Sequence, residues 1–235
     1  MSAKRAIILA GGKGTRLRPY TVALPKPLMP IGDYPILEVV VRQLAKAGFS
    51  HITLTVNHQA ELIRAFFGDG SRWNIYIDYS YEKVPMGTMG PLSLIPDLPD
   101  DFLVMNGDIL ADLDFNTFFD DHISSGSLFS ISSYERTHRV DYGVLDTDGS
   151  GKLLGFTEKP QISFRVSMGI YAANKRIVQF IPQSFYGFDT LMLDLIAKEI
   201  PVHVRPHSGY WLDIGRPDDY IQAIEEFESL KGSLF

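Results

Sequence analysis

The sequence predicts an α/β fold, a three-layer α/β/α sandwich with a mixed, mostly parallel central sheet. Short apolar runs alternate with helix-like patterns through the first half of the chain, as in the strand–helix–strand units of parallel sheets. From residue 128 onward, closely spaced strand-like runs indicate a β-rich extension of the same sheet. The 235 residues, 45% of them hydrophobic, suffice for one sizeable core. Because no linker or repeat divides the chain, we expect a single domain over residues 1–235.

The first half should begin with a buried strand at 6–9, followed by an amphipathic helix at 35–47. Ile36, Val40 and Leu44 share one face of this helix, and a proline and a glycine mark its two ends. The next expected elements are a strand at 51–56, a helix at 59–67, a strand at 75–80, a short helix at 88–95 and a strand at 102–105.

The second half should add strands and close with a helix. The expected strands lie at 128–133, 144–146, 153–157, 166–171 and 202–205, and the expected helices at 174–181, 190–199 and 217–230. The turn-rich stretch at 146–151 predicts a hairpin connection. The last helix is amphipathic, with Tyr220, Ile224 and Phe227 on one face.

Composition excludes several classes of function. A net charge of −6 disfavours nucleic acid and anionic membranes as partners, since both require clustered basic surface. The chain has no cysteine, so disulfides, thiolate catalysis and zinc–thiolate sites are excluded. No apolar run approaches the ~20 residues that cross a bilayer, and the apolar run near the start is too short for a signal peptide. We therefore expect a cytoplasmic protein.

The segment after the first strand has the composition of a phosphate-binding loop. Three glycines, Gly11, Gly12 and Gly14, let the backbone approach a ligand and present its N–H groups. Residues 6–32 contain no carboxylate but do contain four basic residues, Lys13, Arg16, Arg18 and Lys26. The spacing fits neither the dinucleotide fingerprint nor a Walker A loop. A triphosphate cradle is the favoured interpretation; the alternative is a surface loop with solvated basic residues.

Two aspartates follow apolar strand-like runs and are candidate metal ligands. Asp108 comes directly after the strand at 102–105, and Asp213 lies in an apolar run before the last helix. Ligands of open α/β sheets bind at the carboxyl ends of strands. Mg²⁺ needs few carboxylates when phosphate oxygens and water complete its shell, so these two would suffice. The alternative role of each is a turn or helix-cap aspartate. Asp112 and Asp114 are interpreted as solvated loop residues.

The run Gly-Gly-x-Gly-Thr-Arg-Leu-x-Pro at 11–19, followed by Lys-Pro-Leu-x-Pro at 26–30, resembles the N-terminal motif of the sugar-1-phosphate nucleotidyltransferases. Further motifs occur through the whole chain in that family's order. The resemblance implies a Rossmann-like core, with a nucleotide-binding part at about 1–115 and a sugar-phosphate-binding part at about 116–235. It implies that Arg16 and Lys26 neutralise charge as pyrophosphate leaves. The implied nucleotide-binding residues are Leu9, Gly11, Gly12, Gly14, Thr15, Glu82, Gly87 and Thr88, and the implied Mg²⁺ ligands are Asp108 and Asp213.

The segment at 81–92 resembles the family's base-recognition loop, with the side chain of Glu82 and the backbone of Gly87 at the base edge. A carboxylate can accept two parallel hydrogen bonds from the N1–H and N2 amine of guanine. Uracil and thymine offer a single N–H, which an amide side chain suits better. GTP is therefore the favoured nucleotide. The alternative is that Glu82 is an ordinary surface residue.

Three later segments resemble the family's sugar-phosphate pocket and contribute Gly143, Glu158, Lys159 and Ser167. Glu158 can accept hydrogen bonds from vicinal sugar hydroxyls, while Lys159 holds the phosphate and assists catalysis. Without the other motifs, Glu158 and Lys159 would be an exposed ion pair. Ser167 replaces an asparagine more often seen in the family, which leaves the sugar open.

The expected reaction joins an NTP to a sugar 1-phosphate of the mannose or heptose type, giving an NDP-sugar and pyrophosphate. The alternatives are a dTTP- or UTP-dependent enzyme acting on glucose 1-phosphate and a non-catalytic subunit that binds nucleotide sugars. An NAD(P)-dependent oxidoreductase is disfavoured by Leu17 in the glycine loop. The sequence leaves homo-oligomerisation open.

Overall fold

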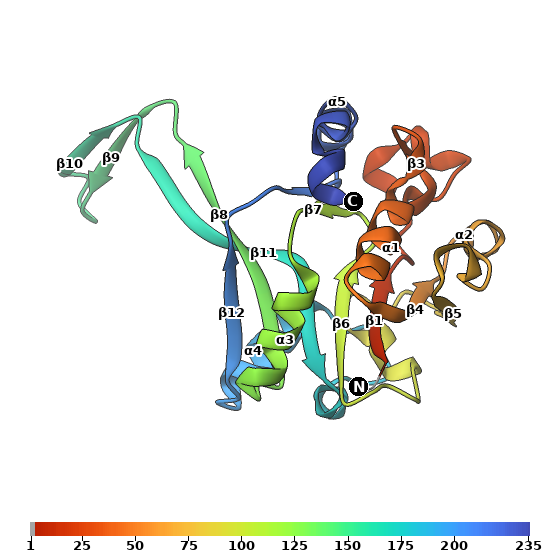
Figure 1. The fold of residues 1–235 in the computed structure, drawn as a ribbon. Coiled ribbons are helices and arrows are strands. Elements are labelled where there is room, and N and C mark those ends of the chain that lie inside the picture. Colours follow the sequence, from red (N-terminus) through yellow and green to blue (C-terminus); the bar gives the residue numbers. More distant parts are fainter. Residues whose placement is uncertain (1–2) are drawn as a thin grey trace.

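The computed structural model describes residues 3–235 and has a seven-stranded mixed sheet at its centre (Figure 1), in the order β12-β8-β11-β6-β1-β4-β5. The strands are β1 (Lys4–Leu9), β4 (Phe49–Val56), β5 (Tyr76–Tyr81), β6 (Asp101–Asn106), β8 (Phe129–Arg139), β11 (Gln161–Asn174) and β12 (Val202–His207). Only β11 runs antiparallel to its neighbours, β6 and β8. The other neighbouring pairs are parallel, which confirms the mixed, mostly parallel sheet.

Helices cover both faces of the sheet because alternate strand residues point to opposite sides. Ala6 and Ile8 of β1 pack with apolar residues of α1, α2 and α3 on one face. Ile7 packs on the other face with α4 and two short 3₁₀ segments. The helices are α1 (Ile36–Lys46), α2 (Ala60–Phe67), α3 (Phe115–Ser125) and α4 (Phe188–Ala197), and the 3₁₀ segments are η5 (Gly90–Leu94) and η6 (Lys175–Phe180). The helices expected at 88–95 and 174–181 are therefore single 3₁₀ stretches.

A third apolar cluster ties the end of the chain to the glycine loop. Phe227 of α5 (Pro217–Leu234) packs with Leu17 of η1 (Thr15–Leu17) and with Leu212. Two short ladders lie in this region. One joins β7 (Ile109–Ala111) to β13 (Trp211–Asp213), and the other joins β2 (Pro30–Ile31) to β3 (Tyr34–Pro35). This packing holds residues from both ends of the sequence above the sheet. Among residues 3–235, no helix combines the length and apolarity that a membrane span requires.

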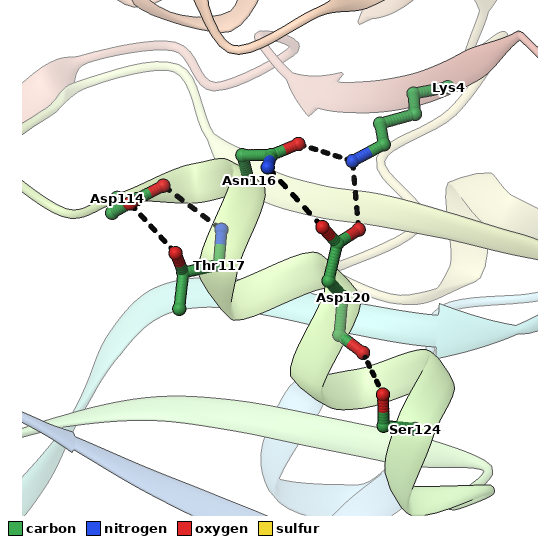
Figure 2. A network of polar contacts seen from close by, with 6 residues as sticks. All are labelled: Lys4, Asp114, Asn116, Thr117, Asp120 and Ser124. Carbon is green, nitrogen blue, oxygen red and sulfur yellow. Dashed lines mark hydrogen bonds and ion pairs between the residues drawn. The ribbon is translucent and has the colours of Figure 1, made fainter.

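The α3 helix was not expected from the sequence, and its start is fixed by polar contacts (Figure 2). The Asp114 carboxylate accepts hydrogen bonds from the backbone N–H and the hydroxyl of Thr117, at 2.9 and 2.8 Å. Lys4 of β1 contacts Asn116 and pairs with Asp120 at 2.9 Å. Asp114 is therefore the N-cap of α3, and its side chain is exposed, as expected of a solvated residue.

Asp112 was wrongly interpreted as a solvated loop residue. Its Oδ1 lies 2.9 Å from His207 Nε2 and accepts a hydrogen bond from the Tyr210 backbone N–H at 2.7 Å. Asp112 therefore joins the chain after β7 to the segment after β12.

The largest departure from expectation is the length of β8 and β11. The part of the chain in which these strands leave the body, residues 134–166, is called the arm. The strands expected at 128–133 and 166–171 continue to Arg139 and start at Gln161. At the tip, β9 (Gly143–Thr147) and β10 (Leu153–Glu158) pair only with each other. Figure 1 shows this tip hairpin standing clear of the sheet and its helices.

Candidate active site

The glycine loop that follows β1 is held in one conformation by its neighbours. Gly14 has a φ of 60°, in the left-handed region, and its carbonyl accepts a hydrogen bond from the Thr21 hydroxyl at 2.8 Å. A Cβ at Gly14 would lie 2.9 Å from Thr21 Cγ2. Glycine is therefore required at this position, and the loop has a defined backbone conformation although Lys13, Arg16 and Arg18 are exposed.

A cavity of about 660 Å³ opens beside this loop, at the carboxyl ends of β1, β4 and β6. This is where open α/β sheets bind ligands. The structure brings together here most of the residues expected to bind nucleotide. Those that line the cavity are Leu9, Gly11, Gly12, Glu82, Gly87 and Thr88, and the expected metal ligand Asp108 lines it as well. Gly14 and Thr15 continue the loop outside the cavity lining.

The Glu82 carboxylate faces the glycine loop across the cavity. A Cβ at Gly11 would lie 2.6 Å from Glu82 Oε1, so any other residue at position 11 would displace this carboxylate. The Met86 backbone N–H donates to Glu82 Oε2 at 3.1 Å. Burial nevertheless raises the pKa of Glu82 above its ordinary value. The side chain is thus fixed, partly desolvated and equipped with one oxygen that is free of that backbone contact.

Gly87 and Thr88 shape the opposite wall of the cavity. Gly87 has a φ of 79°, and a Cβ there would lie 2.6 Å from the Tyr186 carbonyl oxygen. The Thr88 hydroxyl accepts a hydrogen bond from the Phe188 backbone N–H at 2.7 Å. This bond ties the wall to the start of α4, so Thr88 has a structural task beside any contact with a ligand.

The two candidate metal ligands meet through the β7–β13 ladder. Asp213 pairs with Ile109, and the Ile214 backbone N–H donates to the Asp108 carbonyl at 3.1 Å. The Lys26 ammonium contacts Asp108 Oδ2, whereas Asp108 Oδ1 is buried without a hydrogen-bond partner. Residues 105 positions apart in the sequence thereby come together above the sheet.

The electrostatics of this pair suit a divalent cation. Partial desolvation and the charge of Asp108 raise the pKa of Asp213, against the opposite effect of Lys26 and Arg16. The Arg16 guanidinium lies near Gly215, where a Cβ would be 3.4 Å from its Nη1. The unpaired Asp108 oxygen and the repulsion between the carboxylates would both be relieved by a hard cation such as Mg²⁺. Residues 3–235 contain no group of three or more potential metal ligands, so phosphate oxygens and water would complete the shell.

The residues expected to bind sugar phosphate are divided between the body and the arm. Ser167 lies on β11 at the edge of the body, where its hydroxyl donates to the Tyr171 hydroxyl at 3.2 Å. Tyr171 is close enough to Asp213 for that charge to help raise its pKa to about 12, although burial is the main cause. In contrast, Gly143, Glu158 and Lys159 lie on the tip hairpin, and no residue of the arm lines the cavity.

Sequence reasoning missed several residues that line the cavity, and part of the signal was available. Thr55 and Asn57 lie at the end of an expected strand, so the rule that strand ends carry ligands could have found them. The Asn57 amide donates to the Glu82 carbonyl at 2.9 Å, and the buried Thr55 hydroxyl has no partner. Phe185 and Asp189 come from a distant segment around α4, for which no local pattern gave a signal.

Comparison with known proteins agrees with this geometry. The family model described as "Nucleotidyl transferase" matches residues 5–229. A UTP–glucose-1-phosphate uridylyltransferase from Synechocystis is 35% identical and covers 94% of this chain and 62% of its own length. The mannose-1-phosphate guanylyltransferase catalytic subunit beta of Danio rerio is also 35% identical and covers 94% of this chain and 63% of its own. The chain thus spans less than two thirds of the length of these two relatives.

Solved structures are also similar to this chain, and one of them has a similar length. The crystal structure of HddC from Yersinia pseudotuberculosis is 30% identical, with a TM-score of 0.74, and covers 95% of this chain and 99% of its own. A second crystal structure of HddC, complexed with GMP-PN, is 29% identical with a TM-score of 0.71.

Proposed function

The chain belongs to the nucleotidyl transferase family, and from this we propose that it is an enzyme that transfers a nucleotidyl group from an NTP to a sugar 1-phosphate. The products are an NDP-sugar and pyrophosphate. One observation supports the proposal above the others: Asp108, Asp213 and Lys26 converge beside a cavity that begins at the glycine loop. A site that only bound a nucleotide sugar would need no second carboxylate at this position.

The residues of the body would position the triphosphate and offset its charge. The glycine loop would present backbone N–H groups to the phosphates, while Arg16 and Lys26 approach from the side of the carboxylates. Asp108 and Asp213 would hold Mg²⁺, which when bound supplies charge neutralisation at the phosphate oxygens. A sugar phosphate oxygen would attack the α-phosphorus in line. Because that nucleophile is already anionic, no side chain needs to act as a base.

We propose GTP as the nucleotide and a mannose- or heptose-type sugar 1-phosphate as the acceptor. The fixed Glu82 carboxylate supports guanine, since it can accept from both N1–H and the N2 amine. The guanylyltransferase relative and the HddC structure complexed with GMP-PN also favour a guanine nucleotide. A second candidate is transfer from UTP to glucose 1-phosphate, which the uridylyltransferase relative favours at equal identity. We further propose that residues 1–235 form one catalytic domain.

The test is pyrophosphate release measured with four NTPs, each combined with mannose, heptose and glucose 1-phosphates in the presence of Mg²⁺. The proposal expects turnover in at least one combination and the highest kcat/KM with GTP. Highest kcat/KM with UTP and glucose 1-phosphate would select the second candidate. Nucleotide-sugar binding without turnover in any combination would replace the enzyme with a non-catalytic binding subunit.

A further inference from the structure

Along β11 the stem of the arm has one apolar and one polar face, and the apolar face is shared with Arg136 and His138 of β8. Ile162, Phe164 and Val166 alternate along β11 with Ser163 and Arg165, and alternate strand residues point to opposite faces. Near the body, this apolar face is covered: Tyr134, which pairs with Val166, packs on Trp211 with ring centroids 5.4 Å apart. Farther out, Ile162 and Phe164 are 52% and 48% exposed. An apolar face of this kind is built to be covered.

The tip hairpin continues the same pattern and carries the sugar-phosphate residues with it. Leu145 pairs with Phe156 and Gly143 with Glu158, so the four positions share one face of the hairpin. The Phe156 ring lies across Gly143, where a Cβ would be 2.5 Å from ring atom Cε2. Leu145 and Phe156 are 62% and 60% exposed. The face that presents Glu158 is therefore also the most apolar part of the tip.

The ladder between β8 and β11 fixes the direction of the arm. Pairing is unbroken from Ser167 with Ser133 to Gln161 with Arg139, so the stem is a continuous ribbon that leads away from the body. Lys159 has a φ of 45°, in the left-handed region that non-glycine residues rarely adopt. This outlier sits at the residue that the family motif assigns to the sugar phosphate. The chain thus holds Lys159 in a defined backbone conformation, at the tip of an arm that lines no part of its own cavity.

We propose that the arm packs across a second copy of this chain, so that Glu158 and Lys159 complete the partner's sugar-phosphate site. This inference rests on the proposed function. The surface that covers the arm belongs to a second copy of the chain. The residues that the arm carries act only beside a phosphate-binding cavity, and each copy offers one such cavity and one such arm. A two-fold axis makes the exchange reciprocal.

The amount of exposed apolar surface agrees with a dimer of this kind. A two-stranded ribbon is marginally stable in water unless something packs on it. A stable interface buries roughly 800 Å² on each partner, and side chains of this size that are about half exposed supply roughly 100 Å² each. Exposed apolar side chains of the arm are numerous enough for most of that area: Tyr142, Leu145, Leu154, Phe156, Ile162 and Phe164.

The first experiment is complementation between two inactive variants, Asp108→Asn with a defective body and Lys159→Ala with a defective arm. The two chains are co-expressed with different tags and purified through both tags in turn. If the arms are exchanged, each mixed dimer has one intact site, formed by the body of the Lys159→Ala chain and the arm of the Asp108→Asn chain. The mixed dimer should then show about half of the wild-type turnover per dimer. The matched control pairs Asp108→Asn with Asp213→Asn, which both damage the body and restore nothing. Absence of recovery in the first pair would overturn the proposal, because it means that each arm serves its own body.

The second experiment does not depend on the enzymatic activity. Light scattering should give twice the 26.4 kDa chain mass for the wild type and a monomer for the double variant Leu145→Ser, Phe156→Ser. The control is Leu193→Ser, Ile196→Ser on α4, whose side chains are as exposed but lie on the body, and this variant should remain a dimer. A monomeric wild type, or an arm variant that stays dimeric, would overturn the proposal. Both outcomes are readable even when no NTP and sugar pair gives turnover.

A third measurement locates the arm directly and uses the absence of cysteine in the chain. One tagged chain carries Thr157→Cys at the tip, and a second, differently tagged chain carries Lys13→Cys at the cavity. A bismaleimide should link the two tags in one product. Ser124→Cys near the end of α3 replaces Lys13→Cys as the control and should give none. Equal linking at both positions would contradict the proposed placement.

Discussion

The body places the residues around the phosphates by burying what supports them, whereas the arm leaves both its supporting and its functional residues in solvent. Asp108 and Lys26 are mostly buried, and they meet above β1 and β6, whose central residues are all buried. On the tip hairpin, Leu145 and Phe156 are more than half exposed beside Glu158. The comparison teaches that half of the proposed site is rigid by packing within one chain, while the other half requires a surface to pack on.

The largest expected effect comes from the carboxylates of the body. Asp108→Asn removes a charge beside the phosphates while retaining the shape of the side chain, so turnover should fall by about 10³-fold or more. The melting temperature in the absence of metal should change little. Pyrophosphate release and circular dichroism check both statements, with exposed Asp33→Asn as the control. Near-normal turnover with Mg²⁺ would remove Asp108 from the metal site.

Deleting the tip separates the two regions most directly. Arg139 and Gln161 are paired, so residues 140–160 can be replaced by the two-residue turn Asn-Gly. Sugar transfer should fall by about 10²-fold or more, because both sugar-phosphate contacts on the hairpin are lost. The Kd for the NTP should stay within about twofold of the wild-type value, since no arm residue lines the cavity. Calorimetric titration measures the Kd, and a comparable loss of NTP affinity would show that the regions are not independent.

Truncating a buried side chain of the body should lower the free energy of unfolding more than deleting the tip of the arm does. Leu44 is fully buried between α1 and the sheet, so Leu44→Ala should lower the free energy of unfolding by about 2–5 kcal/mol. The tip deletion should change it by less than about 1 kcal/mol when unfolding is followed on dilute monomer. Urea unfolding compares the two variants at equal protein concentration. A tip deletion as damaging as Leu44→Ala would mean that the arm supports the body.

Base recognition should respond selectively to Glu82→Gln. The kcat/KM for GTP should fall about tenfold while that for UTP and dTTP changes little, because only guanine uses two acceptor oxygens. The raised pKa of Glu82 means that it protonates at a higher pH than an ordinary glutamate. The KM for GTP should therefore rise on the acid side in the wild type and stay flat in the variant. Equal losses of kcat/KM across all four NTPs would show that Glu82 does not recognise the base.

The smallest effect concerns Asp213 and pH. Its raised pKa means that the folded chain binds this proton more tightly than the unfolded chain does. Stability of the metal-free protein should thus fall as pH rises above the ordinary carboxyl value of 3.8, by less than about 1 kcal/mol because the side chain is partly open to water. Asp213→Asn should remove this slope, and Mg²⁺ should oppose it only in the wild type. Thermal melts across pH, with and without Mg²⁺, measure this slope in the wild type and in Asp213→Asn.

The sequence was most informative where the physics is local. Gly14 could be predicted because a close backbone approach needs glycine, and α1 because its apolar spacing is regular, whereas Gly87 was predicted only from the family resemblance. α3 was missed because its Phe-Asn-Thr-Phe-Phe start combines weak helix formers, and the Asp114 cap that starts it also suits a turn.

Long-range features could not be read from the chain. That Asp108 lies beside Asp213 depends on a ladder between segments a hundred residues apart, and only the family motif pointed to it. The direction of the arm depends on where β8 and β11 leave the sheet, which strand propensity does not encode. The 660 Å³ cavity likewise includes Phe185 and Asp189, which arrive from α4 and its preceding loop.

The three-pair ladder between β7 and β13 also constrains when the protein can become active during synthesis. A nascent chain that has emerged from the ribosome only as far as β11 contains β1, β4, β5 and β6, but it still lacks Phe185 and Asp189 of the cavity wall. It lacks Asp213 until the final segment appears and docks beside Asp108. The second carboxylate is thus the last part of the proposed site to be made, and a chain that stopped before β13 would lack both Asp213 and the packing of α5 on the glycine loop.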